Sequence, residues 1–103
     1  MPKGYWIGQV TIIQPEPYSE YAKAAKIAVK KYGGRYMIRA GAHVAFEGEW
    51  KPRHVMIEFD SYQTALDCYN SPEYQSAKAM RLAAAAADLL VIEGSDEELA
   101  SKT

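Results

Sequence analysis

Two side chains that can move a proton, Glu58 and His54, occur in the short stretch 53–59, which reads RHVMIEF. The apolar succession Val55, Met56 and Ile57 within it predicts a central β-strand that is buried on both faces. Because side chains alternate along a strand, Glu58 and His54 are expected on the same face. Desolvation would raise the pKa of a carboxyl group there, which suits a general base. Glu58 and His54 are therefore the predicted catalytic residues.

Glu58 also has a purely structural interpretation. A carboxylate is costly to bury without a partner, and an ion pair with Arg39 or Arg53 would remove that cost. Structural ion pairs perturb pKa values as active sites do. The sequence leaves both interpretations open.

Four further residues, Arg39, Gln9, Tyr69 and Tyr74, are candidates for binding a substrate. The guanidinium of Arg39 can hold a carboxylate or an enolate with two hydrogen bonds, although a solvated arginine at a strand end is the alternative. Gln9 shares the predicted face of Glu58. Tyr69 and Tyr74 flank a helix break, where their hydroxyls could reach a ligand, although tyrosines at helical spacing also serve as core residues with a polar tip.

No metal or cofactor is expected. His43 and His54 are the only histidines, and their separation of eleven residues matches no recognised ligand spacing. The single cysteine, Cys68, lacks a partner motif for nucleophilic catalysis and is interpreted as a packing residue. The sequence contains no GxSxG, phosphate-loop, CxxC or dinucleotide-binding motif.

Hydrophobic periodicity and turn residues predict the elements that would position these residues. A split second helix follows from Ser71-Pro72, which can end one helix and begin the next. The alanine run 83–87 favours continuation of that helix because alanine has the highest helix propensity. Tyr62 is expected on the inner face of its first half. The predicted elements are strand 5–13, a helix from Pro17 to Gly33, strand 35–39 continued by 43–47, strand 53–59, a helix from Asp60 or Ser61, and strand 89–93.

This β-α-β-β-α-β order predicts an α+β, ferredoxin-like fold, in which helices cover one face of a four-stranded antiparallel sheet. A single domain is expected over 1–94, followed by a polar tail, 95–103. The uncovered face would carry Ile7, Gln9, His54, Met56 and Glu58. Such a face is too apolar to remain in water, so a homodimer with a cavity between two facing sheets is predicted.

Composition narrows the partners and the compartment. The formal net charge is −1 and no basic stripe is present, so nucleic acid is not an expected partner. The longest apolar run, 82–87, is too short for a membrane span. One cysteine and the absence of a signal-peptide pattern favour a reducing, cytoplasmic location.

Several fragments in one order resemble the domain-of-unknown-function family 1330, within the dimeric α/β-barrel superfamily. The resemblance covers about residues 3–94, and it implies a ferredoxin-like protomer that forms a homodimer. Superfamily relatives include cofactor-independent monooxygenases, lactone isomerases and haem-handling proteins, so it implies no single activity. The fragments that carry it are KGYWI from Lys3, YGGRY from Tyr32 with Arg39 after it, EGEW from Glu47, Pro52-Arg53, IEF from Ile57 and YNSPEYQ from Tyr69.

Two functions remain after these steps. The first is an enzyme without a bound cofactor, an isomerase or a monooxygenase acting on a small acidic or enolisable metabolite held between the sheets. In it Glu58 or His54 would move a proton and Arg39 would hold the anion. The second is a non-catalytic homodimer that binds a metabolite or acts as a scaffold.

Overall fold

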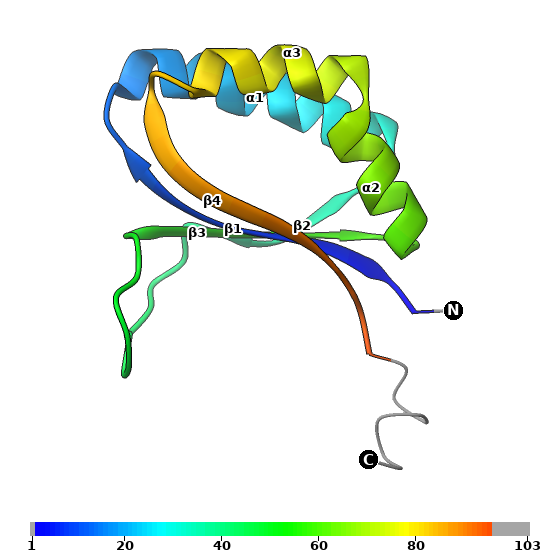
Figure 1. Cartoon of the computed structure of the whole chain (residues 1–103), viewed down its shortest axis with the longest axis horizontal. Coiled ribbons are helices and arrows are strands. Elements are labelled where there is room, and N and C mark those ends of the chain that lie inside the picture. Colours follow the sequence, from blue (N-terminus) through cyan, green and yellow to red (C-terminus); the bar gives the residue numbers. More distant parts are fainter. Residues whose placement is uncertain (1, 96–103) are drawn as a thin grey trace.

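The computed structural model describes residues 2–95 as a four-stranded antiparallel sheet with three helices on one face (Figure 1). The strand order is β2-β3-β1-β4, and each neighbouring pair runs antiparallel. The predicted ferredoxin-like architecture is confirmed. The polar tail expected at 95–103 lies outside the described residues from position 96. The elements are β1 (Gly4–Ile12), α1 (Pro15–Lys31), β2 (Arg35–Arg39), β3 (Arg53–Phe59), α2 (Tyr62–Asn70), α3 (Pro72–Arg81) and β4 (Ala85–Glu93).

Ser71 separates α2 from α3 and serves both. Its hydroxyl donates to the carbonyl of Cys68 (2.7 Å) at the end of α2. The same oxygen accepts from the amide of Tyr74 (3.1 Å) as the N-cap of α3, and Pro72 occupies the first helical position. The predicted split of the second helix is therefore confirmed, and it places Tyr74 in the first turn of α3.

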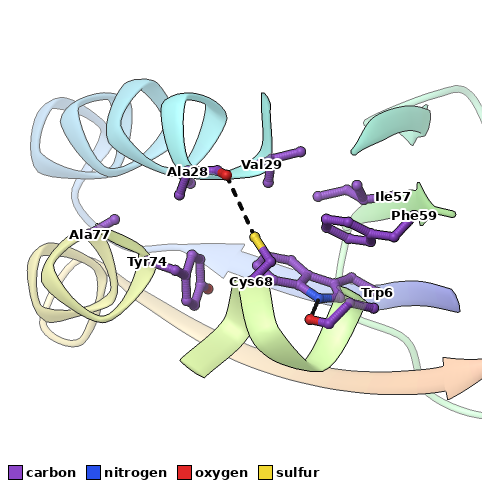
Figure 2. Packing of buried hydrophobic residues seen from close by; sticks show 10 residues of the cluster. Trp6, Ala28, Val29, Ile57, Phe59, Cys68, Tyr74 and Ala77 are labelled. Carbon is purple, nitrogen blue, oxygen red and sulfur yellow. Dashed lines mark hydrogen bonds between the residues drawn. The ribbon is translucent and has the colours of Figure 1, made fainter. Parts of the chain in front are cut away.

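Trp6 of β1 lies at the centre of the core (Figure 2). Its indole N–H donates to the carbonyl of Ala65 (2.9 Å), and its ring lies 5.4 Å from Phe59 and 4.7 Å from Tyr74 between ring centroids. Cys68 is fully buried beside α1, where its thiol contacts the carbonyl of Ala28 (3.7 Å). Burial raises the pKa of Cys68 to about 12, which keeps the thiol protonated and unreactive.

The alanine run does not extend the helix, and that prediction is wrong for its second half. Helix α3 ends at Arg81, and β4 begins at Ala85 rather than at Leu89. Residues 85–87 pair with 10–12 of β1, so ladder hydrogen bonds outweigh a helix preference worth less than about 1 kcal/mol per residue. Tyr62 was also wrongly assigned to the inner face of α2, since it is 38% exposed.

The predicted strand extension at 43–47 is also wrong. Ala40 has a positive φ of 57°, and the chain leaves the sheet there after one last hydrogen bond to the carbonyl of His54 (2.8 Å). The segment 40–52 then forms a loop that projects from the side of the sheet opposite the helices (Figure 1). Phe46 in this loop is 89% exposed. Among the described residues, no helix combines the length and apolarity needed to cross a membrane.

Candidate functional site

The predicted site residues lie on both faces of the sheet. Gln9 and His54 line a groove of about 430 Å³ on the open face, together with Asp88 and mainly apolar side chains. Arg39 and Tyr74 line a smaller cavity, of about 60 Å³, between the sheet and the helices. Tyr69 lines neither space and packs against the rings of Trp6 and Tyr74. The structure therefore does not bring the six candidates into one site.

Glu58 lies outside both spaces and is paired. One of its carboxylate oxygens accepts from the guanidinium of Arg35 (3.0 and 3.1 Å), and the other accepts from the hydroxyl of Tyr5 (3.0 Å). These hydrogen bonds, that of Tyr5 first, lower the pKa of Glu58 instead of raising it. The arginine partner is Arg35, not the expected Arg39 or Arg53, because Arg35 is directly opposite Glu58 in the β2–β3 ladder.

His54 lies beside aromatic rings of the projecting loop. Its ring is perpendicular to those of His43 and Trp50, with centroids 4.4 and 5.9 Å away. The Nε2 atom of His54 is buried and has no hydrogen-bond partner. Within residues 2–95, no three His, Cys, Asp or Glu side chains come close enough together to hold a metal ion.

The 60 Å³ space, here called the arginine cavity, is enclosed by β1, β2, β3, β4, α1 and α3. Its walls include the apolar side chains of Val10, Ala22, Ala25 and Leu89. Its polar lining consists of arginine and tyrosine side chains: Arg39, Arg53, Arg81, Tyr18, Tyr21, Tyr36 and Tyr74.

None of the three arginines forms an ion pair with a carboxylate in the described part of the chain. Each lies instead over a tyrosine ring, at 4.8 Å for Arg39 over Tyr36 and 5.7 Å for Arg53 over Tyr18. Arg81 lies 5.5 Å from the ring of Tyr21 and is only 8% exposed. A guanidinium that contacts an aromatic face keeps the N–H donors at its edge available for a ligand.

Asp88 also borders the arginine cavity, but its carboxylate belongs to the other face. Asp88 pairs with Gln9 in the β1–β4 ladder, and Gln9 lies on the open face. The carboxylate accepts from the amide of Gln9 (3.4 Å) and from the ammonium group of Lys51. The negative charge of Asp88 is therefore compensated by Lys51 and does not neutralise the arginines.

A β-bulge in β2 brings Arg39 to the cavity. Tyr36 pairs with Ile57 and Ile38 pairs with Met56, so Met37 is an extra residue in the ladder. Arg39 consequently lies opposite Val55, on the covered face. In a regular strand Arg39 would share the face of Arg35, four positions earlier, and would lie on the open side.

Gly8 leaves room for the cavity. Positions 6, 8 and 10 of β1 all face the helices, and Trp6 and Val10 are buried on either side of Gly8. A Cβ atom at position 8 would lie 3.3 Å from the Leu89 side chain, closer than ordinary van der Waals contact. The missing side chain thus creates part of the space below the arginines.

Tyr21 and Tyr74 are joined by a hydrogen bond between their hydroxyls (2.9 Å). Burial, and then the neighbouring Tyr74, raises the pKa of Tyr21 well above its ordinary value. Tyr21 therefore stays protonated near neutral pH, and the hydrogen bond between the two hydroxyls uses only one of the two hydroxyl hydrogens. The cavity therefore offers hydrogen-bond donors from three arginines and one tyrosine, a combination suited to an anion.

Sequence reasoning did not identify Arg53, Arg81 and Tyr21 as ligand-facing. The signals were present: Arg53 alternates with Val55 and Ile57, and Arg81 shares a helical face with Tyr74 and Ala77. No pattern in the sequence indicates the bulge that turns Arg39, because it depends on the register between two strands.

Comparisons with known proteins agree with this fold. The family model described as domain of unknown function (DUF1330) matches residues 3–95. A search of curated proteins finds no match. A protein of unknown function from Rhodopseudomonas palustris is structurally similar, with a TM-score of 0.71, 16% identity, and coverage of 92% of this chain and 84% of that one.

Two other solved structures share the architecture at lower similarity. A cofactor-independent oxygenase from Streptomyces nogalater has a TM-score of 0.55 at 9% identity, with 93% of this chain and 96% of that one covered. A dimeric ferredoxin-like protein of unknown function from Thermobifida fusca has a TM-score of 0.50 at 13% identity, with 91% of each chain covered. At these identities the similarity shows the fold alone.

Proposed function

Because the chain belongs to the DUF1330 family, whose description assigns no activity, we propose a function from its own residues. The protein is a homodimer that binds a small organic anion, a carboxylate or an enolate, in the arginine cavity. One observation carries the binding proposal: three guanidinium groups without a carboxylate partner among residues 2–95 line one space. Arg81, which is only 8% exposed, is costly to a protein with no ligand for it, because buried charges normally carry partners.

The roles follow from the face that each residue occupies. Arg39, Arg53 and Arg81 hold the anion, and the Tyr21–Tyr74 pair donates one hydrogen bond to it. Gln9 and His54 belong to the dimer interface. Glu58 acts as an ion-pair partner of Arg35, and Tyr69 supports the core.

The open face supports the homodimer. It exposes the apolar side chains of Ile7, Ile38 and Leu90, and the loop that projects on the same side exposes Val44 and Phe46. A contiguous apolar surface of this kind usually marks an association site. A second copy has the same apolar sheet and loop, and two such sheets would pack about 10 Å apart. The similar protein from Thermobifida fusca is itself described as dimeric.

A catalytic role, as a cofactor-independent isomerase or monooxygenase, is the second candidate. It is favoured by the electrostatics of the cavity, since fixed guanidinium donors stabilise the negative charge of an enolate. The described lining contains no histidine or glutamate, and the Asp88 carboxylate is bound to Lys51. The proton of a substrate with an acidic C–H or O–H would therefore pass to water, and the Tyr21–Tyr74 pair, which is already protonated, would donate a hydrogen bond to the anion that forms.

A thermal-shift screen of small carboxylic acids tests the binding proposal, because a ligand of the native state raises its apparent stability. The wild-type protein should show a raised Tm with at least one acid, and Arg53→Met should abolish the shift. Arg35→Met, which removes an arginine from the open face, is the matched control and should retain the shift. The proposal fails if no acid stabilises the wild type, or if Arg53→Met responds as the wild type does.

A further inference from the structure

The projecting loop 40–52 exposes apolar side chains, and the sheet beside it carries a mainly apolar groove. We infer that the loop of each copy covers the groove of the other in the homodimer, with Phe46 as the central contact. This inference rests on the homodimer proposed above and adds the segment that completes its interface. The fixation of the loop, the area of the exposed surface and the size of the groove support it.

The base of the loop is fixed to the sheet. The amide of Ala40 donates to the carbonyl of His54 (2.8 Å), and the amide of Lys51 donates to the side-chain oxygen of Gln9 (3.0 Å). The ammonium group of Lys51 also binds the carboxylate of Asp88. Contacts near both ends therefore hold the loop in its projecting course within a single copy (Figure 1). A loop that is ordered in advance loses little conformational entropy when it binds.

The tip of the loop presents apolar side chains to solvent. Phe46 is 89% exposed, which is the largest value among the large apolar side chains of the described residues, and Val44 is also exposed. The indole N–H of Trp50 donates to the carbonyl of Glu47 (2.8 Å) across the turn at the tip. Glu47 and Glu49 follow Phe46, and their negative charges oppose docking on an anionic lipid surface. A protein surface is the better match for this tip.

The exposed apolar area shows that the sheet needs the loop. Four large apolar side chains of the open face are 42% to 51% exposed, and three of the loop are 60% to 89% exposed. At roughly 200 Å² for a fully exposed large side chain, the sheet offers on the order of 400 Å² and the loop a similar area. A standard interface buries about 800 Å² per partner, of which about 65% is apolar in homodimers. The sheet alone falls short of this apolar area, and the sheet with the loop exceeds it. The seven side chains are Ile7, Ile38, Leu90 and Ile92 of the sheet, and Val44, Phe46 and Trp50 of the loop.

The groove has room for an aromatic ring from another copy. It measures about 430 Å³, whereas a cavity that accommodates benzene measures roughly 150 Å³. Its lining includes Ile7, Met56 and Leu90, and the exposure of Phe46 shows that this ring does not fill the groove of its own copy. Aromatic side chains seated in apolar pockets supply much of the binding energy of protein interfaces. In a two-fold dimer the contact is made twice, because each copy supplies one loop and one groove.

Sedimentation velocity over a concentration series tests this inference. Phe46→Glu should raise the dissociation constant of the dimer at least tenfold, and circular dichroism should show an unchanged fold because Phe46 is exposed. Ile27→Glu replaces an exposed apolar side chain of α1 and is the matched control, with no expected change.

Disulfide capture locates the contact. Oxidising a mixture of the Phe46→Cys and Leu90→Cys proteins should yield covalent dimers that contain one copy of each. A mixture of the Phe46→Cys and Ile27→Cys proteins should not. The native Cys68 is fully buried and protonated, so it does not compete.

The outcomes separate this inference from the proposed homodimer. A wild type that is monomeric at all concentrations would remove the homodimer, and this inference with it. A dimeric wild type whose association Phe46→Glu leaves unchanged would overturn the exchange of loops while the homodimer stands. Equal capture by Leu90→Cys and Ile27→Cys would show that the tip does not lie in the groove, and would also overturn the inference.

Discussion

The two faces of the sheet differ in whether their charged side chains have ion-pair partners. On the open face, where water is available, the ionic groups are paired: Glu58 with Arg35, and Asp88 with Lys51. On the covered face, where desolvation is costly, Arg53 and Arg81 lack a carboxylate partner within residues 2–95. Stability alone would favour ion pairs on the covered face, because a charge without a partner costs most free energy where water is excluded.

We attribute the difference to two roles: the paired charges stabilise the structure, and the arginines without a carboxylate partner serve the proposed ligand. The paired charges of the open face hold β1, β2, β3, β4 and the loop together, whereas the arginines of the covered face contact tyrosine side chains and no carboxylate within residues 2–95. Each of the four predictions below changes one face and measures the property assigned to that face.

Removing both inner arginines should have the largest effect on binding. The double variant Arg53→Met, Arg81→Met should lose at least about 100-fold in anion affinity, equivalent to about 3 kcal/mol. Its stability without ligand should equal or exceed that of the wild type, because apolar side chains replace charges that lack partners. Titration calorimetry and thermal denaturation measure the two quantities. Reduced stability without ligand would show that these arginines are structural after all.

A charge on the open face should dissociate the homodimer. Ile7→Glu introduces a carboxylate into the proposed interface and should weaken association by about 2 kcal/mol or more, which is roughly 30-fold. Ile27→Glu, on the exposed side of α1, is the control and should leave association unchanged. Sedimentation velocity at micromolar concentration distinguishes the two masses. A wild type that sediments as a monomer would contradict the proposed dimer directly.

A methyl group at position 8 should reduce the cavity without unfolding the chain. Gly8→Ala places a Cβ atom 3.3 Å from Leu89, so a small adjustment of that side chain is needed. Anion affinity should fall about tenfold, or 1.4 kcal/mol, while the Tm changes little because alanine is less costly than glycine in a strand. Gly41→Ala, in the projecting loop with open space around it, is the control for loss of a glycine. Unchanged affinity in Gly8→Ala would place the ligand outside the cavity.

The smallest expected effect is the pH dependence of the open-face ion pair. Hydrogen bonds from Tyr5 and Arg35 lower the pKa of Glu58 in the folded state. Glu58 therefore contributes stability above its unfolded pKa of about 4.3, and this contribution is lost as the pH falls through the lower folded value. The Tm of the wild type should fall more steeply below about pH 4.5 than that of Glu58→Gln. If the Tm of the two proteins depends on pH in the same way, the Glu58–Arg35 ion pair does not contribute to stability.

Much of the fold was predictable because alternation along strands is a strong signal. Ile7, Gln9, His54 and Met56 were assigned to the uncovered face, and all four line the groove on that face. The loop 40–52 was not predictable, because a sequence of apolar residues such as 43–47 does not show whether a neighbouring strand is available to pair with it.

The candidate site was less predictable than the fold. Glu58 attracted attention as an isolated carboxylate in an apolar strand, yet its partner, Arg35, depends on the register of β2 against β3. The arginine cavity is formed by residues from four strands and two helices, among them Arg53 from β3 and Arg81 from α3. The cavity exists because side chains from several elements pack without filling the space next to Gly8. No single stretch of sequence contains that information.

The extra residue in β2 has a consequence for how relatives of this chain are compared. Arg35 and Arg39 are separated by an even number of positions, and counting along the sequence would give them equivalent environments. Met37 makes them different: one arginine is neutralised within the protein and the other is available to solute. In a relative that is one residue shorter here, a regular strand would still direct the second arginine toward the helices. In a relative of equal length that lacks the bulge, the second arginine would lie on the open face, like the first. The length of this short segment, rather than the identity of its arginines, therefore decides whether a homologue has an arginine in the position of the proposed anion site.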